Sequence, residues 1–147
     1  MIGVLSYEPA TGDDLDELVE LRIEAMRESL ERLGRFDPAR ARERFASGFE
    51  PERTRHVLLD GHRVGFVVVK PHPGGLLLDH LYLRPNAQGR GVGSRVLADV
   101  LADAKVRGLT VLVGALRESS ANAFYIRHGF QRVGEAEWDV YYRRAPA

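Results

Sequence analysis

Residues 88–94, "QGRGVGS", place three glycines between an apolar run and a helical pattern. The run "LLLDHLYLRP" precedes them, and apolar residues follow at helical spacing, namely Val96, Leu97, Val100, Leu101 and Ala104. Glycines let a backbone come within hydrogen-bond distance of an anion, because no Cβ stands in between. A helix start adds unpaired N–H groups and a partial positive charge. The segment therefore predicts a phosphate-binding turn.

The glycine spacing separates this turn from two common nucleotide-binding patterns. A Walker A loop needs a lysine after its last glycine, and residues 88–94 contain none. The dinucleotide fingerprint needs G-x-G-x-x-G after a first strand, whereas Gly89, Gly91 and Gly93 give G-x-G-x-G after a later one. A turn whose glycines serve only packing, and a binder of nucleotide phosphates, stay open at this point.

Two segments resemble the Gcn5-related N-acetyltransferase (GNAT) family. Gln88, Gly91 and Gly93 meet its pattern [RQ]-x-x-G-x-[GA], and "AFYIRHGF" at residues 123–130 is similar to its A-x-x-(F/L)-Y-x-x-x-G-F segment. The resemblance covers most of the chain. It implies a domain that uses acetyl-CoA as co-substrate and moves the acetyl group to a primary amine by direct attack in a ternary complex.

The resemblance also assigns cofactor contacts. In the family, amides of the glycine turn hold the pyrophosphate of acetyl-CoA, and the backbone of the preceding strand pairs with the pantetheine arm. By position, the turn contacts fall to Gln88, Gly89, Arg90, Gly91, Gly93 and Ser94. The strand contacts fall to the backbones of Leu81 and Leu83, whose side chains we assign to the core.

Acetyl transfer needs a neutral amine, a stabilised oxyanion and a protonated leaving thiolate. The resemblance points to Tyr125 as the acid, and a phenol with a pKa of about 10 is protonated at neutral pH. For the base there are two candidates, Asp79 and His80, which strand alternation places on opposite faces. In the family, base-like side chains share a face with the residues that match Leu81 and Leu83, and this favours Asp79. The alternative bases are His80 and water. Tyr125, Asp79 and His80 could also have purely structural roles.

One position departs from the family pattern. The family commonly has Asn seven residues before the tyrosine, and this chain has Glu118 there. A carboxylate at a helix start would repel a phosphate. Asn122, one turn before Tyr125, is our candidate to replace the lost cofactor contact.

Periodicity along the chain predicts the elements that position these residues. We expect a strand over residues 2–8, a capping box of Thr11 with Asp14, a helix ending at Gly34, and a shorter helix from Asp37-Pro38 with Ala41 and Phe45 inward. A hairpin at Asp60-Gly61 follows, then a central strand, the long helix, a strand, a short helix capped by Ser119 or Ser120, and two closing strands.

The element order predicts the fold class. Strands joined by one long helix should run parallel with a right-handed crossover, and hairpin strands antiparallel. We expect an α/β (α+β mixed) protein with a mixed, mostly antiparallel central sheet of about seven strands and helices on both faces, in a GNAT-like fold. Residues 1–147 should form a single N-acetyltransferase domain.

Composition narrows the function classes. The formal net charge is zero, from 21 basic and 21 acidic residues, so nothing favours a nucleic-acid or membrane partner. The chain has no cysteine, which excludes thiol catalysis, and its histidines show no metal-ligand spacing. We expect no metal site, no signal peptide, no membrane span and a cytoplasmic protein.

The amine acceptor is not determined by the sequence. Candidates to receive a cationic amine are Glu24, Glu28, Phe36 and Asp37, although solvated or core roles are the preferred explanation for all four. Small-molecule and peptide amines stay open. A homodimer through exposed closing strands, with Trp138, Tyr141 and Tyr142, is a candidate assembly. The competing function is a non-catalytic acyl-CoA-binding module of the same fold.

Overall fold

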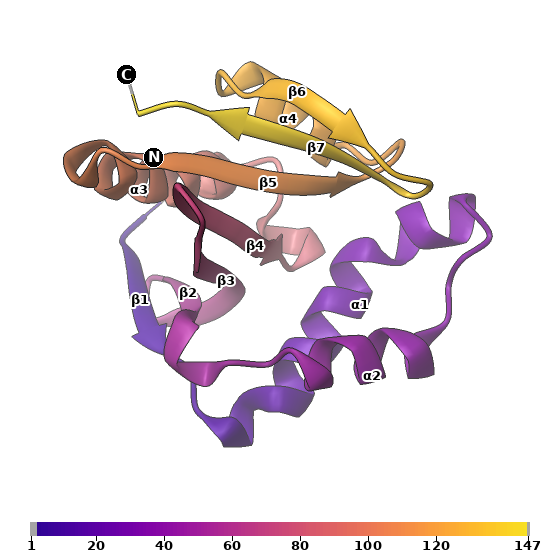
Figure 1. Cartoon of the computed structure of the whole chain (residues 1–147). Coiled ribbons are helices and arrows are strands. Elements are labelled where there is room, and N and C mark those ends of the chain that lie inside the picture. The colour runs from indigo at the N-terminus through magenta and orange to yellow at the C-terminus, as the bar shows by residue number, and fades with distance from the viewer. Residues whose placement is uncertain (1–2, 147) are drawn as a thin grey trace. The chain divides into compact units, whose positions relative to one another are not determined.

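A computed structural model describes residues 3–146 (Figure 1). Within them lie seven strands: β1 (Leu5–Pro9), β2 (Thr54–Leu59), β3 (His62–His72), β4 (Gly75–Leu83), β5 (Thr110–Leu116), β6 (Gln131–Glu135) and β7 (Asp139–Arg144). The α-helices there are α1 (Leu15–Arg32), α2 (Pro38–Ser47), α3 (Val92–Arg107) and α4 (Ala121–Arg127). Short 3₁₀ turns are η1 (Gly12–Asp14), η2 (Pro51–Arg53) and η3 (Pro85–Ala87).

The strands form a mixed sheet in the order β1-β2-β3-β4-β5-β7-β6. Strands β4 and β5 pair in parallel, while β1–β2, β2–β3, β5–β7 and β6–β7 are antiparallel. This confirms the predicted fold class. The chain divides into two compact units: the first holds the described residues up to Val68 together with His80–Val96, and the second holds Val69–Asp79 and the described residues from Leu97 onward.

In the first unit, α1 and α2 are formed and capped as the sequence predicts. The Thr11 backbone N–H donates to Asp14 Oδ2 at 2.9 Å, which fixes the start of the helical segment. Asp37 caps α2 by accepting from the Arg40 backbone N–H at 3.1 Å. Both helices pack against β3 through a buried cluster: Leu18, Val19 and Leu21 of α1, Phe45 of α2, and Phe66 and Val68 of β3.

The hairpin between β2 and β3 also follows the prediction. Asp60 and Gly61 both have positive φ, at 52° and 81°, as the two central residues of a tight primed turn require. This turn sets β2 beside β3 and so brings His56 and Arg63 into one polar network of the first unit, described below.

In the second unit, β5 pairs with the start of β4 and with β7. The parallel register runs from Gly75↔Thr110 to Leu78↔Val113, which leaves Asp79–Leu83 beyond the paired segment of β4. The first residues of β4 are mostly buried and the later ones half-buried. The prediction of a strand buried on both faces therefore holds only for its first half.

Three expectations are corrected or limited by the structure. Tyr142 is 3% exposed and belongs to the core, so it cannot contribute to a surface for a second copy, whereas Tyr141 is 43% exposed. Ser120 is at the N-cap of α4, but its side chain makes no capping hydrogen bond. The strand expected over residues 2–8 is observed from Leu5, and Ile2 lies outside the described residues.

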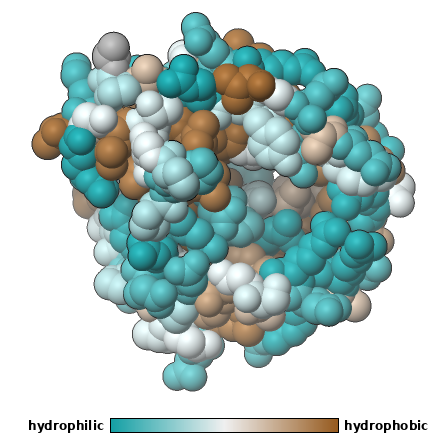
Figure 2. All heavy atoms as spheres, viewed as in Figure 1, coloured by the Kyte–Doolittle hydropathy of each residue, from teal (hydrophilic) through white to brown (hydrophobic). Residues whose placement is uncertain are grey.

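Exposed apolar side chains are dispersed over several elements. Those of large size are Val4, Val106, Ile126, Val133 and Tyr141. The face drawn in Figure 2 is accordingly hydrophilic over most of its area, with small apolar groups between. Within residues 3–146 no helix has both the length and the apolar composition that crossing a bilayer requires.

Candidate functional site

The glycine turn in the first unit has the geometry expected of an anion cradle. It lies between two buried anchors, Ala87 at 1% and Val92 at 0% exposure, while Gly89 and Gly91 are exposed. Gly89 has φ +73° and Gly91 has φ +82°, values that residues with a Cβ rarely adopt. The glycines are therefore required by the backbone path of the turn.

The turn leads directly into the N-terminus of α3. The Arg95 backbone N–H donates to the Gly91 carbonyl at 3.2 Å, as the first bond of the helix. The N–H groups of Val92 and Gly93 precede that bond and have no acceptor within the helix. With the positive end of the helix dipole, they form an environment that favours an anion.

The β4 residues assigned to the pantetheine arm precede the turn in the same unit. Leu81 and Leu83 are half-buried and belong to the part of β4 beyond its parallel pairing. Gln88 bends back, and its side-chain Nε2 donates to the Leu83 carbonyl at 2.9 Å. Gln88 thus stabilises the path from strand to turn, a contact that the sequence pattern alone does not specify.

Asp79 lies in the second unit, at the point where the parallel pairing of β4 ends. Its carboxylate is 3.2 Å from Lys70 Nζ of β3, and both side chains are partly exposed. The sequence analysis did not identify Lys70 as its partner. The Lys70 ammonium competes for the Asp79 oxygens that would accept a proton.

His80 lies in the first unit among aromatic rings. Its ring centroid is 5.2 Å from that of Phe45, 5.6 Å from that of Tyr82 and 6.2 Å from that of Phe66. Asp79 and His80 point to opposite faces of β4, as strand alternation requires. The packing of His80 on α2 supports its structural interpretation.

Tyr125 occupies the middle of α4 in the second unit and is 5% exposed. Its ring packs edge-on against Phe130 at 5.4 Å and lies 6.4 Å from Tyr142. These contacts fix the orientation of the phenol ring, and helix α4 fixes the position of its Cα.

Asn122 is used for hydrogen bonds inside the second unit. Its Nδ2 donates to the carbonyls of Leu116 and Ser119, both at 3.0 Å, and its Oδ1 accepts from the Tyr142 hydroxyl at 2.8 Å. The side chain therefore joins the end of β5 to α4 and β7. A cofactor contact from Asn122 stays a prediction.

Glu118 is exposed and lies just before α4, with φ +68°. Asn is several-fold enriched in this left-handed conformation, because its side chain bonds locally to the backbone, whereas Glu is not. The local geometry thus gives a physical reason for the family's preference for Asn at this position. This chain therefore has the left-handed turn at position 118 but has Glu there in place of the better-suited Asn.

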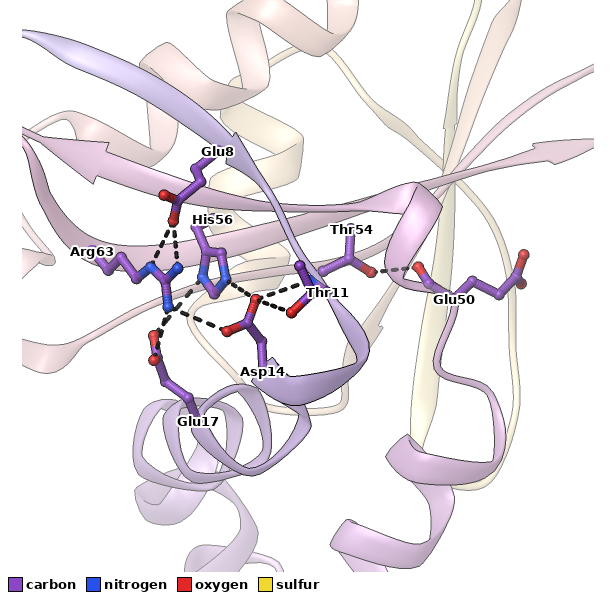
Figure 3. A network of polar contacts seen from close by, with 8 residues as sticks. All are labelled: Glu8, Thr11, Asp14, Glu17, Glu50, Thr54, His56 and Arg63. Atoms are coloured by element: carbon purple, nitrogen blue, oxygen red, sulfur yellow. Dashed lines mark hydrogen bonds and ion pairs between the residues drawn. The ribbon is translucent and has the colours of Figure 1, made fainter.

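A polar network in the first unit was not predicted from the sequence (Figure 3). His56 on β2 is fully buried, and its Nε2 lies 3.0 Å from Asp14 Oδ2. Arg63 of β3 donates to Glu8 Oε1 at 2.8 Å and to Glu17 Oε1 at 3.0 Å. The partners are more than 40 residues apart along the chain, so no local motif marks them.

The network shifts two ionisation equilibria. The hydrogen bond from His56, followed by that from the Thr11 backbone, lowers the pKa of Asp14 from 3.8 to about 2. The hydrogen bond to Glu8 is the first cause that raises the pKa of Arg63. Although a buried His–Asp pair resembles part of a catalytic dyad, no nucleophile is paired with it among the described residues, and we assign it to stability.

The candidate acceptor residues all have structural partners in the first unit. Glu24 pairs with Arg84 at 3.6 Å, and Glu28 with Arg32 at 3.1 Å. The Phe36 ring lies under the Arg27 guanidinium, and Asp37 caps α2. Among residues 3–146, no cluster of His, Asp or Glu has the arrangement of a metal site.

Comparison with known proteins identifies the fold. The acetyltransferase (GNAT) domain family matches residues 52–132, more than half of the chain. No curated protein matches in sequence. The structure is similar to PaiA N-acetyltransferase of Thermoplasma acidophilum, crystallised with coenzyme A, with a TM-score of 0.77 at 17% identity over 97% of this chain and 99% of that one.

Two further solved structures are similar over nearly their full length. An acetyltransferase of Thermus thermophilus gives a TM-score of 0.76 at 20% identity, covering 98% of both chains. The ribosomal-protein-S18-alanine N-acetyltransferase of Escherichia coli gives 0.67 at 17% identity, covering 98% of this chain and 95% of that one. At these identities the similarity establishes the fold.

Proposed function

Because the chain belongs to the acetyltransferase (GNAT) family, we propose that it moves an acetyl group from acetyl-CoA to a primary amine by direct attack in a ternary complex. The observation that carries the proposal is the turn of residues 88–94: two glycines in left-handed conformation, immediately before a 16-residue helix. The coenzyme A in the crystal of the Thermoplasma protein supports the same co-substrate.

The turn fits the diphosphate of coenzyme A on physical grounds. A Cβ added at Gly89 would meet nothing within 4 Å, so the turn's outer side is open to a ligand. The amides of Val92 and Gly93 would donate to phosphate oxygens, and the exposed Arg90 guanidinium suits a phosphate in charge and shape. The remaining contacts fall to Gly89, Gly91 and Ser94, while Gln88 holds the strand end in place.

Proton transfer is the second part of the proposal. Tyr125 would protonate the leaving thiolate, since an unperturbed phenol carries its proton at neutral pH and this ring is fixed by packing. Asp79 would remove a proton from the amine, directly or through water. The acceptor itself is a small-molecule or peptide amine; the Escherichia coli relative, by its name, acts on an alanine of a ribosomal protein.

The test combines thermal unfolding with a turnover assay. Coenzyme A should raise the unfolding free energy by about 2.7 kcal/mol at a concentration 100 times its dissociation constant, and ATP should not. Free thiol should be released from acetyl-CoA in the presence of a mixed amine panel. Gly91→Asp should weaken coenzyme A binding at least about tenfold, since it adds a Cβ and a negative charge to the turn.

Gly108→Asp is the matched control for this substitution. Gly108 follows the other end of α3, also has positive φ at 68°, and has open space on the side where a Cβ would lie. It should suffer a similar loss of stability but keep its affinity for coenzyme A. Equal loss of affinity in both variants would mean that the turn is not the binding site.

A non-catalytic acyl-CoA-binding module is the second candidate. Glu118 favours it, because a carboxylate beside α4 replaces the neutral Asn of the family. Stabilisation by coenzyme A without thiol release on any amine would support this alternative. Stabilisation by ATP alone would contradict both.

A further inference from the structure

Arg22 stands at the centre of the inward-facing side of α1. It lies four residues after Leu18, three after Val19 and four before Met26, so the neighbours on its helix face are apolar. Leu18 and Val19 are buried in the core cluster of the first unit. An arginine is unexpected at such a position unless its charge has a partner.

No partner for that charge is found in residues 3–146. The Arg22 Nε is buried and has no hydrogen-bond acceptor among these residues. The contact that the guanidinium does make is with the ring of Tyr82 on β4, at 5.8 Å from Cζ to the ring centroid. This contact supports the group without using its N–H donors.

Other half-buried arginines in the described chain are satisfied. Arg63 is bonded to Glu8 and Glu17, and Arg84 pairs with Glu24. Arg117 and Arg144 donate to backbone carbonyls. The buried Nε–H of Arg22 has no acceptor, which is unfavourable inside a protein, so the exception at Arg22 requires an explanation.

We infer that Arg22 binds a carboxylate of the acceptor, so that the substrates of this enzyme are amines that also carry a carboxylate. The inference rests on the proposed acetyltransferase function. The planar guanidinium offers donors matched to the two oxygens of a carboxylate, and a ligand that brings this group supplies the missing partner. Purely cationic acceptors such as polyamines would meet an unpaired positive charge and are disfavoured.

The anion could instead come from a phosphate of coenzyme A, and the variants distinguish the two sources. Arg22→Met removes the charge and keeps an aliphatic side chain that can pack on Tyr82. Arg22→Lys keeps the charge but loses the planar guanidinium that can donate two parallel hydrogen bonds. Arg27→Gln is the control, because Arg27 is an exposed arginine of the same helix, paired with Glu31. Coenzyme A affinity should be unchanged in all three variants.

The assay uses matched acceptors: glycine, phenylalanine, 4-aminobutyrate and dialanine, each beside its carboxamide. For the best pair, kcat/KM should be at least about tenfold higher for the carboxylate than for the carboxamide. Arg22→Met should remove this preference by raising KM for the carboxylate, with the carboxamide changed less than about twofold. Arg22→Lys should be intermediate and Arg27→Gln should match the wild type.

A second readout does not depend on turnover. The Nε–H resonance of Arg22, assigned as the signal absent in Arg22→Met, should shift on titration with a carboxylate acceptor and not with its carboxamide. The inference is wrong if this resonance responds to neither or to both, if the wild type shows no carboxylate preference, or if Arg22→Met instead weakens coenzyme A binding. Failure of the proposed function is recognised separately, by absence of both thiol release and stabilisation by coenzyme A.

Discussion

Tyr125 has a core position, and we propose that its hydroxyl also acts as the proton donor. Its ring is packed between Phe130 and Tyr142 and is 5% exposed. The packing would be equally good for phenylalanine, so the hydroxyl alone separates the structural from the catalytic interpretation.

Tyr125→Phe should therefore lower turnover by about 100-fold or more, because an acid catalyst typically contributes that much. Affinity for coenzyme A should stay close to the wild type, since the ring contacts are kept. Steady-state kinetics over a range of pH, beside calorimetric binding of coenzyme A, measures both. Unchanged turnover at every pH would exclude Tyr125 as the acid.

Tyr142→Phe is the matched control at this scale. Tyr142 is also a buried tyrosine of the second unit, and it donates to Asn122 at 2.8 Å. Its loss should lower stability by about 1 kcal/mol, the typical contribution of one hydrogen bond, and leave turnover largely intact.

At the scale of elements, the segment before α4 contains the main departure from the family pattern. Glu118 adopts φ +68°, whereas the glycines at comparable turns, Gly89 and Gly91, adopt such angles without a Cβ. The Asn122 side chain supplies hydrogen bonds at this junction, to Leu116 and Ser119. The junction is thus held by a side chain one turn further along the helix.

Glu118→Asn should raise the unfolding free energy by roughly 0.5–1 kcal/mol, because Asn tolerates the left-handed conformation better. It should also tighten coenzyme A binding by removing a negative charge, with a larger effect at low than at high salt. Chemical denaturation and binding titrations at two ionic strengths provide the measurement. Glu118→Gln, which removes the charge without restoring Asn, should reproduce only the binding effect.

At the scale of the whole molecule, stability should depend on pH through Asp14. Its folded-state pKa is about 2 and its unfolded value is near 3.8, so the ionised form is stabilised by folding. This contribution is fully present above about pH 4 and is lost as the pH falls toward 2. A shift of this size corresponds to roughly 2 kcal/mol.

Asp14→Asn should therefore unfold more easily at neutral pH by roughly 2 kcal/mol, and its stability should fall less steeply between pH 4 and 2. Denaturant unfolding at several pH values measures the difference. Asp13→Asn, a neighbouring exposed position in η1, is the control and should follow the wild type. Parallel pH curves for the wild type and Asp14→Asn would contradict the role of the network.

The sequence by itself determined the elements, the mixed sheet and the glycine turn, because these follow from local preferences: the caps at Thr11 and Asp37, the Asp60-Gly61 turn, and glycines at positive φ.

Only the tertiary structure decided which charged side chains contact one another. His56 with Asp14, Lys70 with Asp79 and Arg22 against Tyr82 depend on elements brought together by packing, and side-chain direction there is set by twist and burial rather than by spacing. The burial of Tyr142 was mispredicted for the same reason, since its side chain contacts Asn122 and Tyr125 of α4, whereas Tyr141 of the same strand is exposed.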